Sequence, residues 1–93
     1  RILNLCLEDE NQTEELIWRQ EELNELALRE ATPVGHRLRI DYTDPEGERF
    51  SQVIVPQKIV RGKFYLWVES VDKEGRVLPR YRVDLIENIV FLA

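Results

Sequence analysis

Hydrophobic residues recur along this chain with two different periods, and the period changes near Pro33. Before that point, apolar residues recur at helical spacing over residues 13–31, with many glutamates between them. Thr13 followed by two acidic residues favours the start of a helix, and Pro33 with Gly35 favours its end. We therefore predict a helix over residues 13–31. Its apolar stripe is formed by Leu16, Leu23, Leu26 and Ala27, widened by Ile17 and Trp18.

From His36 onward, apolar and polar residues alternate with the period of two that is typical of strands. Asp-Pro-Glu-Gly at residues 44–47, Arg61-Gly62, and Asp-Lys-Glu-Gly at residues 72–75 predict tight turns. The strands are predicted over residues 38–42, 49–59, 63–71, 77–84 and 89–92, with a further short strand over residues 2–7. Five short strands after a helix predict a mainly β fold with an N-terminal α-helix, closed into a small five-stranded bent barrel.

The chain has 93 residues, which correspond to one domain. Residues 1–33 are expected to hold the N-terminal strand and an acidic helix, and residues 34–93 the barrel. The net charge of −5 is unevenly spread, because residues 1–31 carry nine acidic residues against three arginines. Residues 32–93 carry ten basic residues against nine acidic ones, so the barrel can present a basic patch.

Two further features of composition suggest the setting of the chain. It contains no methionine, even at position 1, so we expect it to be a piece of a longer protein. It has no apolar run of about 18 residues, so we expect no membrane contact. Cys6 is the only cysteine, which excludes an internal disulfide and favours a cytoplasmic location.

The strongest candidate for function is a pair of strand segments rich in arginine and aromatic residues. Pairing them across a four-residue turn at 72–75 sets Tyr65 opposite Arg82 and Trp67 opposite Arg80 on the outer face. The cations just upstream, which would extend this face, are Lys58, Arg61 and Lys63. The inner face would then consist of Phe64, Leu66, Val68, Pro79, Tyr81 and Val83.

Arginine grips phosphate oxygens, and aromatic rings stack on bases. The outer face therefore predicts a nucleotide or single-stranded nucleic acid as the ligand. The same arginine–aromatic pairs would equally stabilise an ordinary exposed sheet face, at about 0.5–1 kcal/mol each. Trp67 would also fit beneath the N-terminal helix, so spacing alone leaves both interpretations open.

Nothing in the residue types favours an enzyme. His36 is the only histidine, so a pair of catalytic histidines is impossible, and we expect it to be a solvated residue between helix and strand. Cys6 lies in an apolar alternation and is expected to be a small core residue. The sequence has no glycine-rich phosphate loop and no nucleophile motif, so we predict no catalytic residue, no metal and no cofactor.

Several short motifs also resemble one known family in their order and spacing. They are Leu38-Arg39-Ile40-Asp41-Tyr42 with the turn after it, Val53 to Ile59, Phe64-Tyr65-Leu66, and Arg80-Tyr81-Arg82-Val83-Asp84-Leu85-Ile86. From about residue 26 to residue 92, the chain resembles a WYL domain, a family named for a Trp-Tyr-Leu motif. Phe64-Tyr65-Leu66 stands at the position of that motif.

The resemblance implies an Sm-like, SH3-type barrel that acts as a regulatory ligand-sensing domain of a bacterial DNA-acting protein, such as a transcription regulator or a helicase. It points to Tyr65 and Arg82 as ligand contacts, with Arg80 and Tyr42 as weaker candidates. Leu85 stands where the family commonly has a second arginine, so one cationic contact is missing. The alternative function is a docking or dimerisation domain of the parent protein with no affinity for nucleic acid.

Overall fold

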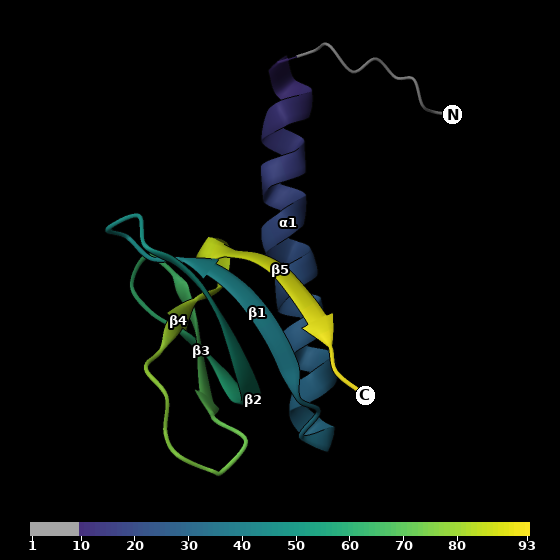
Figure 1. The fold of residues 1–93 in the computed structure, drawn as a ribbon. Helices are drawn as coiled ribbons and strands as arrows, with labels where there is room; N and C mark the ends of the chain where they lie inside the picture. The colour runs from purple at the N-terminus through teal and green to yellow at the C-terminus, as the bar shows by residue number, and fades with distance from the viewer. Residues whose placement is uncertain (1–9) are drawn as a thin grey trace.

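The structure, a computed structural model, describes the backbone of residues 10–93 and the side chains of residues 20–93. One helix precedes a five-stranded antiparallel sheet, so the predicted mainly β fold with an N-terminal helix is confirmed (Figure 1). The elements are α1 (Glu10–Ala31), η1 (Thr32–Val34), β1 (Leu38–Thr43), β2 (Arg49–Arg61), β3 (Leu66–Val71), β4 (Tyr81–Arg82), η2 (Val83–Leu85) and β5 (Ile86–Phe91). The strand predicted over residues 2–7, with Cys6, lies outside the described residues.

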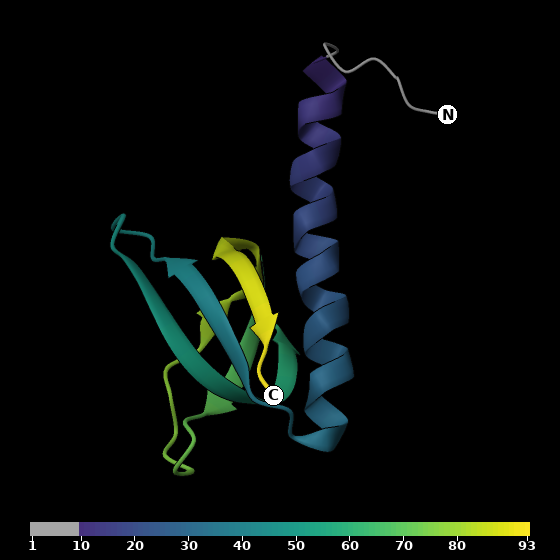
Figure 2. The same ribbon diagram turned by 45° about the vertical axis from the view of Figure 1, so that its right-hand side comes forward.

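The sheet has the order β4-β3-β2-β1-β5, and β2 is the strand that bends it. The first half of β2 pairs with β1, and its second half pairs with β3. The register shifts between Pro56 and Lys58, because the proline cannot donate a ladder hydrogen bond there. The short 3-10 turn η2 joins β4 to β5, which are the two outer strands of the order (Figures 1 and 2). The sheet therefore bends into a barrel-like shape in which η2 connects the two end strands.

Two hairpin turns share one geometry. In the turn at 44–47, the Gly47 N–H donates to the Asp44 carbonyl at 2.8 Å, and in the turn at 72–75 the Gly75 N–H donates to the Asp72 carbonyl at 2.9 Å. Both glycines have positive φ, 91° and 87°, which explains the residue type there. Hydrogen bonds from the Arg76 and Glu74 N–H groups lower the pKa of the Asp72 carboxyl.

Helix α1 packs on the barrel through a face that the sequence did not predict. Asn24, Leu28 and Ala31 are buried, whereas Leu23 and Leu26 are 56% and 63% exposed. The predicted apolar stripe is therefore wrong at Leu23 and Leu26, whereas Ala27 is half-buried. Leu16, Ile17 and Trp18 belong to the part of α1 whose side chains are not described.

The N-terminal half of α1 extends beyond the sheet (Figures 1 and 2). The helix begins at Glu10, so Thr13 is a helical residue rather than its cap, and it ends at Ala31 as predicted. Gly35 has a φ of 63° and closes η1 after Pro33. No helix in residues 10–93 is both long and apolar enough to cross a membrane.

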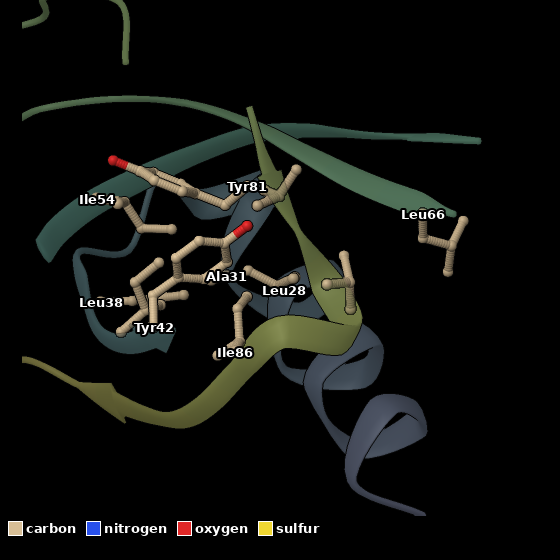
Figure 3. Close-up of a cluster of buried hydrophobic side chains, with 11 residues drawn as sticks. Leu28, Ala31, Leu38, Tyr42, Ile54, Leu66, Tyr81 and Ile86 are labelled. Atoms are coloured by element: carbon tan, nitrogen blue, oxygen red, sulfur yellow. The ribbon is translucent and has the colours of Figure 1, made fainter. Parts of the chain in front are cut away.

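The core lies between α1 and the concave side of the sheet (Figure 3). The rings of Tyr42 and Tyr81 meet edge to face within it, with centroids 5.0 Å apart. The buried hydrophobic residues are Leu28, Ala31, Leu38, Ile40, Tyr42, Ile54, Leu66, Val68, Tyr81, Val83 and Ile86. Alternate residues of β1 and β3 point into this core, as their period of two predicted.

Candidate ligand-binding site

The predicted pairing of the third and fourth strands is wrong by two residues, although the faces are right. Trp67 lies opposite Arg82, and Val68 lies opposite Tyr81. One residue of the shift arises in the turn, where the Asp72 N–H donates to the Arg76 carbonyl. The second arises before β4, around Pro79, which cannot donate a ladder hydrogen bond.

A shift of two residues keeps the side chains of the paired residues in β3 and β4 on their predicted faces. Arg82 and Trp67 point outward, whereas the buried residues of the inner face are Leu66, Val68, Tyr81 and Val83. Phe64 and Pro79 were predicted on that inner face and are exposed instead. Phe64 leaves the face because β3 begins only at Leu66, after a turn closed by the Gly62 N–H on the Tyr65 carbonyl.

Arg82 and Tyr65 are in direct contact on the outer face. The Arg82 guanidinium carbon lies 3.5 Å from the centre of the Tyr65 ring, as expected for a cation stacked on an aromatic face. Arg82 Nε and Nη2 also donate to the two carboxylate oxygens of Asp84, at 3.1 Å and 2.8 Å. Hydrogen bonding to Asp84 raises the pKa of the Arg82 guanidinium. Arg82 is thus charged, oriented and already engaged by an anion.

Trp67 supports this contact from the side. Its ring meets the Tyr65 ring edge to face at 6.3 Å. A Cβ atom on Gly62 would lie 2.8 Å from Trp67 Nε1, so the indole packs directly on the glycine. Trp67 is half-buried against the loop that holds Tyr65, and this packing makes it a positioning residue for Tyr65.

The freest aromatic ring of the site is one that the sequence had assigned to the core. Phe64 is 78% exposed, and Tyr65 beside it is 41% exposed. The Lys63 ammonium lies 5.5 Å from the centre of the Phe64 ring. The signal that could have placed Phe64 outside was Gly62, because a glycine after a long strand often opens a turn of several residues.

Direct contacts link Lys63, Phe64, Tyr65 and Arg82 at the β2–β3 loop, and Arg61 at the end of β2 adjoins this surface. We call it the aromatic loop surface and define it as Arg61, Lys63, Phe64, Tyr65 and Arg82. Among the described residues, Arg82 has a carboxylate within 4.0 Å, whereas Arg61 and Lys63 have none.

Two predicted contacts lie elsewhere. Arg80 donates through Nε and Nη2 to one oxygen of Glu69, at 2.9 Å and 2.6 Å, and so is held along the sheet. Tyr42 is buried, and its hydroxyl accepts the Arg82 backbone N–H at 2.9 Å. Tyr42 therefore fixes the backbone of Arg82 and does not reach the outer face.

Helix α1 adds a carboxylate near this surface. Burial raises the pKa of the Glu21 carboxyl, and the neighbouring charges of Asp84 and Glu25 raise it further. The positive charges of Arg61 and Arg82 lower the pKa of the same carboxyl. Two acidic side chains, Glu21 and Asp84, thus partly offset the cations at the edge of the aromatic loop surface.

Residues that would support other chemistry are engaged structurally. His36 is half-buried rather than solvated, because its Nε2 lies 2.7 Å from the Leu92 carbonyl and its ring contacts Phe91. Within the described part of the chain, no group of three His, Cys, Asp or Glu side chains is placed to hold a metal ion.

Comparison with known proteins is informative at the level of the fold. No family model and no curated protein matches the sequence. Among solved structures, the chain is similar to part of the proteasome accessory factor B/C of Arthrobacter aurescens, with a TM-score of 0.65 and 17% identity. The match covers 74% of this chain but only 11% of that one. The same fold therefore occurs there as a small part of a much longer protein.

Proposed function

We propose that this chain is a WYL-like ligand-sensing domain of a larger bacterial DNA-acting protein, in which α1 and the barrel form one unit. It binds a nucleotide or single-stranded nucleic acid through the aromatic loop surface and passes the bound state to the rest of the parent protein. The fold shared with part of the proteasome accessory factor B/C supports the idea of a module within a longer chain. This function is binding, with no catalytic step.

The observation that carries the proposal is the exposed Phe64 ring with two cations close to it. Lys63 lies over that ring, and Tyr65 next to it is covered by Arg82. A base stacked on an exposed aromatic ring gains about 1–3 kcal/mol in proteins that bind single strands. The adjacent ammonium and guanidinium groups are the donors that a phosphate backbone requires.

The proposal predicts that Arg82→Ala weakens binding of an oligothymidylate, titrated by fluorescence anisotropy at low and high salt. We expect a loss of about three- to tenfold, because Arg82 must leave Asp84 before it can bind phosphate. The slope of log affinity against log salt should fall by about 0.7, the value for one phosphate contact on a single strand. Affinity and slope equal to those of the wild type would contradict the role of Arg82.

Arg76→Ala is the matched control for this titration. Arg76 is exposed directly after the turn at 72–75 and pairs only loosely with Glu74, at 3.7 Å. It removes the same charge away from the aromatic loop surface, so we expect its affinity to stay close to that of the wild type. Equal losses in the two variants would mean that only net charge matters.

A second candidate function is docking to the parent protein, and α1 favours it. Leu23 and Leu26 are exposed on its outer side, next to Glu22, Glu25 and Arg29. The helix has seven glutamates against two arginines, so the partner that fits is a basic amphipathic helix. Sedimentation with and without oligonucleotide separates the two functions. If the domain only docks, its sedimentation coefficient should not change when the oligonucleotide is added. The domain should instead form a complex with a parent fragment, or a dimer.

A further inference from the structure

Asp84 already forms with Arg82 the kind of ion pair that a bound phosphate would form. Its two oxygens accept from Nε and Nη2 of one guanidinium, which is the paired arrangement that arginine makes with carboxylate and phosphate alike. The side chains of Arg82 and Asp84 are only 17% and 28% exposed, so the pair is partly shielded from solvent. Because the two residues are two positions apart, the carboxylate is tethered beside the guanidinium.

The backbone around this pair is fixed by buried hydrogen bonds. Tyr42 accepts the Arg82 N–H, and the Asn24 side-chain amide donates to the carbonyls of Val83 and Ile86. Val83, between the two partners, is fully buried. A change of partner at Arg82 therefore has to occur by side-chain rotation, with the β4–η2 backbone held in place.

We propose that Asp84 is a built-in competitor of the ligand, which holds Arg82 until a phosphate group displaces the carboxylate. This inference rests on the proposed function and adds a mode of regulation to the same surface. The tethered carboxylate excludes free phosphate, because a small anion offers Arg82 nothing beyond what Asp84 already gives. A ligand that also stacks a base on Phe64 gains enough binding free energy from that stacking to displace the Asp84 carboxylate. The surface thus selects for a phosphate that is attached to a base.

The experiment is an oligothymidylate titration of Asp84→Asn at low and high salt. The amide keeps the size of the side chain but removes its charge, so Arg82 is released for the ligand. We expect affinity to rise about two- to fivefold, the range for losing one partly exposed ion pair. We also expect measurable binding of inorganic phosphate, which the wild type should lack.

Two further variants make the result specific. Arg82→Ala combined with Asp84→Asn should bind no better than Arg82→Ala alone, since the released cation is then absent. Glu87→Gln frees Arg49 from a similar ion pair of 3.1 Å on another part of the barrel, and it should leave affinity unchanged. Thermal melts of all variants confirm that each is folded.

The outcomes separate this inference from the function beneath it. If Arg82→Ala weakens binding but Asp84→Asn does not strengthen it, the proposed binding function stands. The proposed role of Asp84 as a competitor is then overturned. A gain that persists without Arg82, or that Glu87→Gln reproduces, also overturns it. Binding that appears only in Asp84→Asn supports a competitor strong enough to silence the wild type. If neither the wild type nor Asp84→Asn binds, both proposals are overturned.

Discussion

Asn24→Ala is expected to lower the free energy of unfolding by about 2–4 kcal/mol, because it removes two buried hydrogen bonds to backbone carbonyl groups. The Asn24 amide donates to the Val83 carbonyl at 3.0 Å and to the Ile86 carbonyl at 2.9 Å. Its own oxygen accepts from Gln20 Nε2 at 3.0 Å. This one side chain therefore joins α1 to both ends of η2, next to the strand that carries Arg82.

Urea denaturation followed by circular dichroism measures this effect. Asn88→Ala is the matched control, since the Asn88 amide is exposed and reaches Asp41 only at 3.5 Å. We expect that change to stay within about 0.5 kcal/mol of the wild type. Equal stability of the two variants would show that Asn24 does not hold the helix to the barrel.

Phe64→Ala is expected to weaken oligothymidylate binding by about tenfold to 100-fold, the cost of losing one stacked base. The ring makes no contribution to the core, because 78% of the residue is exposed. Its removal should therefore leave the melting temperature close to that of the wild type. A large loss of affinity without a loss of stability is the signature of a direct ligand contact.

Phe91→Ala is the matched control for Phe64. Phe91 is 42% exposed at the end of β5 and packs against His36, with ring centroids 5.1 Å apart. We expect it to affect stability more than affinity. If Phe64→Ala and Phe91→Ala bind the oligonucleotide equally well, the Phe64 ring is not a stacking platform.

Local signals in the sequence were enough to predict the element order. A glycine three residues after an aspartate marked each of the two hairpin turns. Alternation along β1 and β3 identified the residues that fill the core. Side chains alternate between the two faces of a strand, so an error of two residues in the register does not change the face. Arg82 and Trp67 were therefore correctly predicted to point outward.

Features that depend on tertiary contacts were not predictable in this way. Asn24 is polar, yet it faces the barrel, where its amide donates to the Val83 and Ile86 carbonyls. The ion pair between Arg82 and Asp84 depends on the turn of η2, which the sequence had read as part of a strand. Phe64 was placed inside because the alternation of β3 was extended past its first residue, Leu66.

The most direct test of the recognition surface is to map oligothymidylate binding on the wild-type domain by the shifts of its backbone amide signals in NMR. Our account predicts that the largest shifts fall on residues 61–66 and 82–84, with little change in the hairpin at 72–75. Shifts confined to α1, or no shifts at all, would contradict it.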